Sequence, residues 1–134
     1  MVDAKGTAMI LIYAGAYQGK LDFARKNFGI KDEDIFYCNS DMESIDFGKK
    51  LIYGLEKFIY GYQMRGQSAS EYIRAQLPLM KDKIIICEDI SRGLVPMDKV
   101  ERVWCETNGR VVNAIAAEAD EVYTVFCGIE SRIK

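Results

Sequence analysis

Short apolar runs that alternate with amphipathic segments constrain the fold of this chain more than any other feature. Residues 9–13 and 83–87 form nearly continuous apolar runs, which are typical of strands buried on both faces. Residues 35–38 and 121–127 have the same strand-like character. Helix-like segments separate these runs, and strands that alternate with helices favour parallel pairing. We therefore predict an α/β fold, a three-layer sandwich with a mainly parallel central sheet.

The segments between the runs have the spacing of helices with one apolar side. Residues 21–28 follow the first run, and Gly29 is suited to end their helix. Residues 49–62 are predicted to form one long helix with charged residues on its outer side, and Gly61 and Gly66 bracket its end. The apolar positions of that predicted helix are Leu51, Ile52, Leu55, Phe58, Ile59 and Tyr62.

Two pairs of residues have the capping-box spacing that marks the first turn of a helix. Ser68 with Glu71 predicts a helix that ends near Pro78, and Asp98 with Glu101 predicts another. The apolar side of the second helix comprises Val100, Val103, Trp104, Thr107, Val111, Ala114 and Ile115. One helix precedes the 83–87 run and the other follows it, as the alternating pattern requires.

Length and composition limit the architecture and the partners. A chain of 134 residues that is 49% hydrophobic fits one compact domain, residues 1–134. The net charge of −2 offers no basic surface for nucleic acid or anionic membrane, so we expect neither as a partner. The sequence has no secretion signal and no apolar run that could span a bilayer, so we expect a cytoplasmic protein. Its four cysteines lack metal-site spacing and are interpreted as buried or reduced thiols.

The chain contains no histidine. This absence excludes Ser-His-Asp and Cys-His nucleophiles, histidine-bound zinc and any phosphohistidine or nucleotidyl-histidine intermediate. The chemistry that remains must rely on backbone amides, lysine, arginine and carboxylates.

The segment from Ala14 to Leu21 carries part of the pattern of a phosphate-binding P-loop. Such a loop needs a strand, then glycines whose amides turn towards phosphate, then a lysine and a Ser or Thr for magnesium. Gly19 and Lys20 have the right order, whereas Ala14 replaces the first glycine and Leu21 the Ser or Thr. Gly15 can replace the lost glycine, but Leu21 has no oxygen for a metal, and of its neighbours only Asp22 could supply one. Lys20 is therefore the phosphate-binding candidate and Mg²⁺ binding is in doubt, with a simple surface turn as the alternative.

A polar segment follows the 83–87 run, at the carboxyl end of a strand where open α/β sheets bind their ligands. Glu88 or Asp89 could hold a metal or accept a hydroxyl proton, and Arg92 could contact a phosphate. The alternative is a solvated turn and helix cap. Four tyrosines could stack on a ligand ring or serve the core and an oligomer contact: Tyr53, Tyr60, Tyr62 and Tyr72.

The carboxyl-terminal third resembles a known family. The similar segments are residues 93–96, 109–111, 116–122, 128–129 and 132–134. They look like the bifunctional adenosylcobinamide kinase/adenosylcobinamide-phosphate guanylyltransferases of cobalamin synthesis. The resemblance has essentially no gaps from about residue 84 onward, and the first strand and its loop fall where that family keeps its P-loop. Residues from about 30 to 80 match poorly.

The resemblance implies a P-loop NTPase-like sheet that binds GTP or ATP, phosphorylates a corrinoid hydroxyl and then transfers GMP to the new phosphate. It also implies a homo-oligomer, because family members usually associate through their helices. Carried over by position, Lys20, Glu88 and Asp89 have catalytic roles. The implied phosphate-binding residues are Gly15, Ala16, Tyr17, Gln18, Gly19, Lys20, Leu21 and Arg92.

Two departures from the family pattern modify this expectation. The family passes GMP through a histidine, which this chain lacks, so we infer that the guanylyltransferase activity is absent. Without the Ser or Thr at Leu21, any kinase activity is reduced, because positioning and charge stabilisation provide most of phosphoryl-transfer catalysis. The leading hypothesis is a shortened, nucleotide-binding family member. The alternatives are a non-catalytic scaffold or partner-binding protein, and a small enzyme that uses Lys20 and the acidic pair on another substrate.

Overall fold

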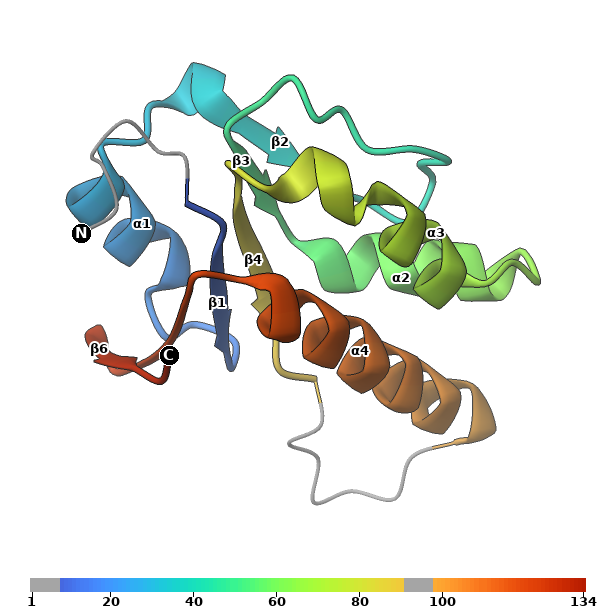
Figure 1. Cartoon of the computed structure of the whole chain (residues 1–134). Helices are drawn as coiled ribbons and strands as arrows, with labels where there is room; N and C mark the ends of the chain where they lie inside the picture. The colour runs from blue at the N-terminus through green and yellow to red at the C-terminus, as the bar shows by residue number, and fades with distance from the viewer. Residues whose placement is uncertain (1–7, 91–97) are drawn as a thin grey trace.

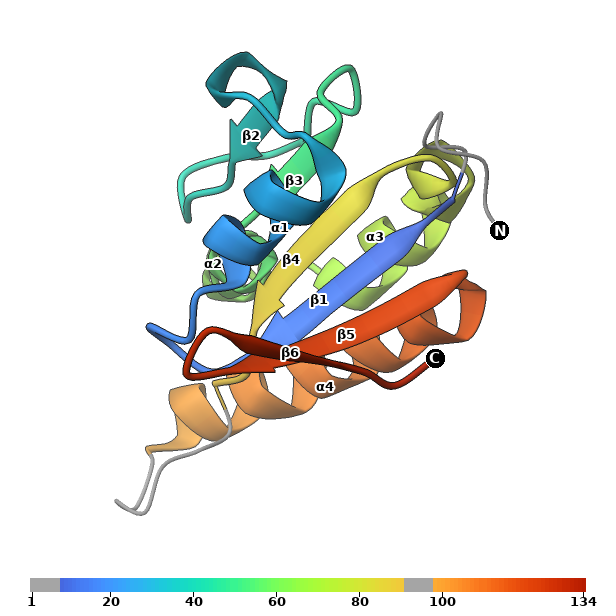
Figure 2. The same ribbon diagram turned by 90° about the vertical axis from the view of Figure 1, so that its left-hand side faces the viewer.

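A six-stranded sheet forms the centre of the computed structural model, which describes residues 8–90 and 98–134 (Figure 1). The strand order across the sheet is β2-β3-β4-β1-β5-β6. The strands are β1 (Ile10–Ala14), β2 (Ile35–Tyr37), β3 (Leu51–Tyr53), β4 (Ile84–Glu88), β5 (Glu121–Phe126) and β6 (Ile129–Arg132). All neighbours pair in parallel except β6, which runs antiparallel to β5 (Figure 2). The predicted α/β class with a mainly parallel sheet is confirmed.

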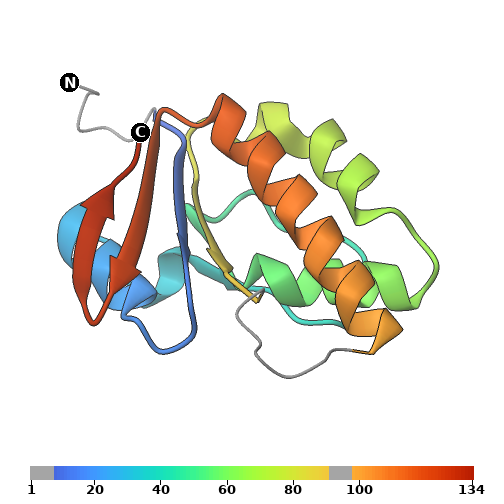
Figure 3. The same cartoon turned by 90° about the horizontal axis from the view of Figure 1, so that it is seen from below.

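Helices cover both faces of this sheet, so the three-layer arrangement is also confirmed (Figure 3). One face packs on α1 (Lys20–Phe28), and the other packs on α2 (Leu55–Met64), α3 (Ala69–Gln76) and α4 (Lys99–Glu118). Short 3₁₀ turns at Asp32–Asp34 and Leu77–Met80 lead into β2 and towards β4. Alternate residues of β1 supply the two cores: Ile10 and Ile12 face α1, whereas Leu11 packs against the three other helices.

The helix predicted over residues 49–62 is wrong at its start. Leu51–Tyr53 is β3, a strand that pairs in parallel with both β2 and β4. Gly54 then adopts a left-handed φ of 82°, and α2 begins only at Leu55. Leu51 and Ile52 are both fully buried because they lie on opposite faces of a central strand. Two adjacent apolar residues fit the pattern of either element, and the pairing partners decide between them.

The predicted helix boundaries are mostly confirmed. Gly29 ends α1 in a left-handed conformation, Ser68 accepts from the Glu71 N–H at the start of α3, and Asp98 and Glu101 form the full capping box of α4. Gly61, however, lies inside α2 rather than at its end. A Cβ at Gly61 would lie only 2.1 Å from the carbonyl oxygen of Ser40, so this position needs glycine for close contact with a loop.

Two further features differ from the predictions. The apolar side assigned to α4 begins too early, since Val100 and Val103 are exposed and the buried part starts at Asn108. The strand β6 was not predicted, because all four of its residues are exposed and none of the usual alternation marks it.

Two compositional expectations can be compared with the structure. Within residues 8–90 and 98–134, no helix combines the length and the apolar character that crossing a membrane requires. The four cysteines are free thiols, of which Cys38 and Cys87 are buried.

Candidate functional site

A surface depression lies at the carboxyl edge of the sheet, next to the loop between β1 and α1. Its volume is ≈440 Å³. Four parts of the chain form it: that loop with the first turn of α1, the end of β3, the first turn of α2 and the end of β4. The lining residues are Ala16, Tyr17, Gly19, Lys20, Leu21, Asp22, Tyr53, Lys57 and Glu88. The structure thus brings most of the predicted phosphate loop and one of the two predicted carboxylates to one place.

The loop leaves the amino end of α1 without a side-chain cap. Gly19 occupies the cap position with a left-handed φ of 88°, and no side chain bonds the first-turn N–H groups. Such N–H groups have no partner within the helix, and together with the helix dipole they attract anions. Tyr17 also has a positive φ, of 60°, and its side chain is fully exposed. The turn therefore presents backbone donors at the depression.

Lys20 is the cation of this loop. Its side chain is only 6% exposed, and its Nζ donates a hydrogen bond to the Gly15 carbonyl oxygen at 2.7 Å. The Glu88 Oε1 lies 3.8 Å from the same nitrogen. A lysine held this way adds positive charge to the uncapped helix end, so the arrangement can bind an oxyanion.

The backbone of Glu88 is fixed by two buried side chains. The Glu56 Oε1 accepts from the Glu88 N–H at 2.9 Å, and the Asn108 Nδ2 donates to the Glu88 carbonyl at 3.2 Å. Burial raises the pKa of Glu56, while this N–H bond works in the opposite direction. The Trp104 Nε1 bonds the Glu56 carbonyl at 2.9 Å and so ties α4 to α2. These contacts hold the Glu88 side chain, which is one-third exposed, towards Lys20.

Asp89 points to the other face of the sheet. The Asp89 N–H bonds the Ala14 carbonyl at 2.8 Å and so continues the pairing of β4 with β1. Successive side chains of a strand point to opposite faces, so Asp89 and Glu88 point to different faces of the sheet. The Tyr13 hydroxyl donates to the Asp89 carboxylate, and burial and then Asp89 raise the Tyr13 pKa. The structure therefore separates the two adjacent acids, and only Glu88 faces the loop. Arg92 lies outside the described residues.

The turn between β5 and β6 supports the loop between β1 and α1 from the side. The Gln18 Oε1 accepts from the Cys127 N–H at 2.6 Å, and the Gln18 carbonyl accepts from the Gly128 N–H at 3.0 Å. A Cβ at Gly19 would lie 3.4 Å from the Gly128 Cα, so the two turns are in close contact. Gln18 is thus a loop residue with a structural role and does not line the depression.

Comparison with known proteins now relates this geometry to a family. The family model for cobinamide kinase / cobinamide phosphate guanyltransferase matches residues 55–133, which is more than half of the chain. The chain belongs to this family. No curated protein matches the sequence at a significant level. The match to the cobinamide kinase / guanyltransferase family begins at the start of α2, so it includes part of the segment of about residues 30 to 80, where the resemblance is poor. It does not include the loop from Ala14 to Leu21.

The residues do not fit a magnesium ion held in the P-loop manner. The position that needs a hydroxyl is Leu21, which has no oxygen, and the neighbouring Asp22 lines the depression as an exposed carboxylate. Glu88 is already close to Lys20, and Asp89 is bonded to Tyr13. In the described parts of the chain, no three Cys, Asp or Glu side chains gather as a metal site would require.

Outside the loop and the first turn of α1, two lining residues, Tyr53 and Lys57, were not among the sequence candidates for the phosphate site. Both come from the segment whose first part was assigned to a helix, and that assignment hid the edge where β3 ends. The signal that could have found them is Gly54, since a glycine after a short Leu-Ile-Tyr run is typical of a strand-to-helix turn. Burial, followed by Glu56 and Glu88, raises the Tyr53 pKa, so its hydroxyl remains a hydrogen-bond donor beside these carboxylates. Tyr53 also packs edge-on against Tyr37, and the other three tyrosines pack against rings too: Tyr60, Tyr62 and Tyr72.

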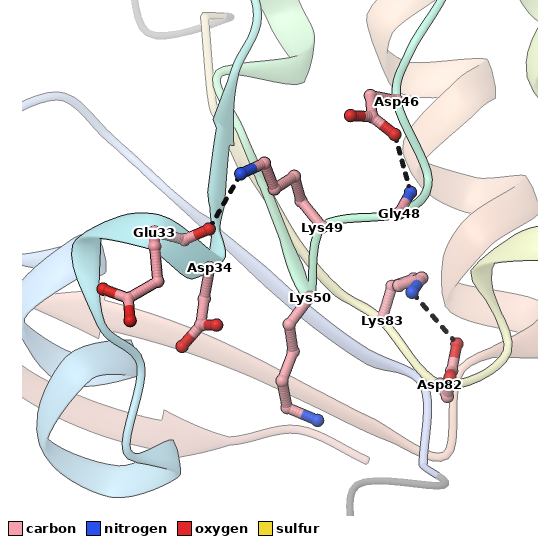
Figure 4. A pocket seen from close by; sticks show the side chains of 8 residues that line it. All are labelled: Glu33, Asp34, Asp46, Gly48, Lys49, Lys50, Asp82 and Lys83. Carbon is pink, nitrogen blue, oxygen red and sulfur yellow. Dashed lines mark hydrogen bonds and ion pairs between the residues drawn. The ribbon is translucent and has the colours of Figure 1, made fainter.

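A second depression, of ≈370 Å³, lies at the opposite, amino edge of the sheet (Figure 4). Three lysines and four acids line it, with Gly48: Lys49, Lys50, Lys83, Glu33, Asp34, Asp46 and Asp82. Lys49 donates to the Glu33 carbonyl at 2.9 Å, and Lys83 lies 3.6 Å from Asp82. Strands of a parallel sheet begin here, and ligands of open α/β folds bind at the other end. We therefore place the candidate site at the carboxyl edge.

Proposed function

We propose that this chain binds the phosphates of GTP or ATP in the carboxyl-edge depression. The observation that carries the proposal is the position of Lys20, buried at the uncapped start of α1 and beside an open, glycine-containing turn. In this proposal the amides of residues 15–19 surround the phosphate oxygens and Lys20 neutralises their charge. Lys57 adds a second, exposed cation at the rim, and Tyr53 offers a ring and a hydroxyl.

The chemistry that follows is a reduced kinase activity towards a corrinoid hydroxyl, the acceptor implied by the family. Glu88 is the carboxylate that faces the loop, so it is our candidate for accepting the hydroxyl proton. Leu21 leaves the loop without its metal-binding oxygen, so we assign no step to a metal ion. Guanylyl transfer by the family's histidine route is absent, because the chain contains no histidine.

A second candidate is a scaffold that keeps the fold without catalysis. The contacts of Lys20 favour it, because the Lys20 ammonium already donates a hydrogen bond to the Gly15 carbonyl and lies near Glu88. A phosphate would have to compete with both oxygens for this cation. The two candidates differ in a measurable quantity, the affinity for nucleotide.

Calorimetric titration of GTP and ATP, with and without Mg²⁺, separates the candidates. We expect wild type to bind a nucleotide more tightly than millimolar and Lys20→Ala to bind it about 10- to 100-fold more weakly, as loss of a charge-assisted bond predicts. Lys26→Ala is the matched control, because Lys26 is an exposed lysine of the same helix away from the depression. Transfer of phosphate to adenosylcobinamide is followed in the same samples.

Two results would contradict the proposal. If neither nucleotide binds above millimolar background, nucleotide binding fails and the scaffold reading stands. If Lys20→Ala binds as well as Lys26→Ala, the nucleotide lies elsewhere on the protein.

A further inference from the structure

The side chain of Tyr17, in the loop between β1 and α1, has no role in the fold. It is fully exposed, and within residues 8–90 and 98–134 no hydrogen bond, ion pair or ring contact involves it. Tyr53, Tyr60, Tyr62 and Tyr72, by contrast, all pack against other rings. A ring that stays in water gains nothing from burial. The stability of the fold therefore does not explain a tyrosine at position 17.

The backbone at this position also disfavours a tyrosine. Tyr17 has a φ of 60°, in the left-handed region that glycine and asparagine adopt with less strain than an aromatic residue. Backbone strain of this kind is concentrated at ligand-binding turns, where the surrounding structure maintains it. A residue that is strained and also makes no contact points to a role in binding.

The place of Tyr17 in the fold supports such a role. Figure 3 shows its loop extending beyond the carboxyl end of β1. Tyr17 lines the same depression as Gly19 and Lys20. Tyr53 lines that depression from the end of β3, and its ring is held edge-on against Tyr37, with 5.6 Å between the ring centroids. The depression therefore has one free ring on its loop side and one fixed ring on its β3 side.

The Tyr17 ring and the backbone donors suit different parts of one ligand. The uncapped start of α1 and Lys20 offer contacts to an oxyanion. A tyrosine ring offers a broad apolar face with few side-chain torsions to fix, and such faces stack on flat conjugated rings. Stacking reads the face of a ring rather than its edge. It therefore favours phosphates that carry a ring over bare phosphate, without a choice between guanine and adenine.

We propose that Tyr17 is a specificity residue that stacks on a flat conjugated ring of the ligand. This inference rests on the proposed function, because the position of the phosphate is taken from there. The ring belongs either to the base of the nucleotide or to the acceptor, and both sources offer the same kind of face. Ligand binding would bring the Tyr17 ring out of water and cover the depression from its loop side.

Calorimetry with ligands that differ in their rings tests the proposal. We expect Tyr17→Asn to bind GTP and ATP at least about 5-fold more weakly than wild type, and inorganic tripolyphosphate within about 2-fold. Asparagine tolerates the left-handed backbone but has no ring. Tyr17→Phe keeps the ring and should bind every ligand as wild type does. Circular dichroism melting should show Tyr17→Asn to be as stable as wild type, since its ring packs on nothing.

Titration of the same variants with adenosylcobinamide identifies the source of the ring. A loss in Tyr17→Asn with this acceptor, and none with GTP or ATP, assigns the ring to the acceptor. Unchanged affinity for GTP, ATP and adenosylcobinamide overturns the proposal. So does an equal loss for tripolyphosphate and nucleotides, because Tyr17 would then act through the loop backbone. A loss in Tyr17→Phe as large as in Tyr17→Asn would assign the effect to the hydroxyl and also overturn stacking.

Lys20→Ala separates the failure of this inference from the failure of the proposed function. If tripolyphosphate binding depends on Lys20 while Tyr17→Asn binds every ligand as wild type does, the phosphate site stands and only the role of Tyr17 fails. If wild type binds neither tripolyphosphate nor nucleotide, the proposed function fails and the role of Tyr17 fails with it.

Discussion

The two ends of the same sheet carry similar side chains but different backbones. At the amino edge, lysines and acids line a depression and bond one another or nearby carbonyls. At the carboxyl edge, Lys20 lies at an uncapped helix start beside a turn with left-handed residues. Charge content does not distinguish the two depressions, since each contains lysines and carboxylates. We therefore expect phosphate binding to depend on oriented backbone donors, with the lysine as an addition.

The largest expected effect is on the free energy of unfolding, and it tests how closely the chain is packed at each edge of the sheet. Gly61→Ala would place a Cβ 2.1 Å from the Ser40 carbonyl oxygen, in the loop after the carboxyl end of β2. We expect it to lower the free energy of unfolding by about 3 kcal/mol, since backbone must move. Gly48→Ala at the amino edge meets only the Asp46 carboxylate, at 3.0 Å, which can rotate away. Urea denaturation should show less than about 1 kcal/mol for Gly48→Ala, and equal losses would contradict the comparison.

A second experiment restores the missing oxygen at the carboxyl edge. Leu21→Ser places a hydroxyl where the P-loop pattern has one, so we expect Mg²⁺ to raise nucleotide affinity about 10-fold in this variant and little in wild type. Calorimetry with and without Mg²⁺ measures the difference. Leu21→Ala controls for loss of the leucine side chain. Strong magnesium dependence in wild type would show that another residue already supplies the metal ligand.

Substitution of a lysine at each edge of the sheet should change nucleotide affinity by different, smaller factors than the change at Leu21. Lys57→Ala removes an exposed cation from the rim of the candidate site, and we expect nucleotide affinity to fall about 3- to 5-fold, less at high salt. Lys83→Ala removes a lysine from the amino edge and should leave affinity unchanged. Calorimetry at two salt concentrations tests both variants. A loss with Lys83→Ala as large as that with Lys57→Ala would place nucleotide at the wrong end of the sheet for our proposal.

The smallest effect concerns the buried carboxyl under Glu88. Burial raises the Glu56 pKa above its ordinary 4.5. Between pH 4.5 and this raised pKa, the folded state therefore binds more protons than the unfolded state. Glu56 therefore contributes stability at low pH that is lost as pH rises through its raised pKa. Glu56→Gln keeps an acceptor for the Glu88 N–H without titrating.

We expect the difference in unfolding free energy between Glu56→Gln and wild type to grow with pH above 4.5, by less than about 1 kcal/mol. Urea denaturation over a pH series measures it. Asp82→Asn, at the exposed amino edge, is the control, and its difference from wild type should be flat in comparison. A pH-independent difference for Glu56→Gln would show that burial does not raise the Glu56 pKa.

Elements with local signals were predictable from the sequence. The Met9–Tyr13 run, the glycine that ends α1 and the Asp98 capping box depend on neighbouring residues, and each is confirmed within a residue or two. The proximity of Lys20 and Glu88 was also predictable, because parallel strands place their carboxyl ends at one edge. Whether these residues bind phosphate stays a prediction.

Features that depend on distant partners were not predictable in this way. Leu51 and Ile52 became a strand because β2 and β4 pair on either side of them. Asp89, next to Glu88 in the chain, was given a catalytic role together with Lys20, yet the alternation of a strand turned it towards Tyr13. The edge strand β6 has no apolar alternation at all and exists through its pairing with β5.

The sequence by itself therefore determined the alternation of strands and helices, the partial match to a P-loop pattern and the absence of any histidine chemistry. These depend on composition and on interactions between residues close in the chain. Only the tertiary structure decided that Tyr53 and Lys57 join the loop, that Glu56 fixes Glu88, and that Gln18 bonds the β5–β6 turn. Contacts of this kind form between residues far apart in sequence, and strand order and register set them, which no local pattern encodes.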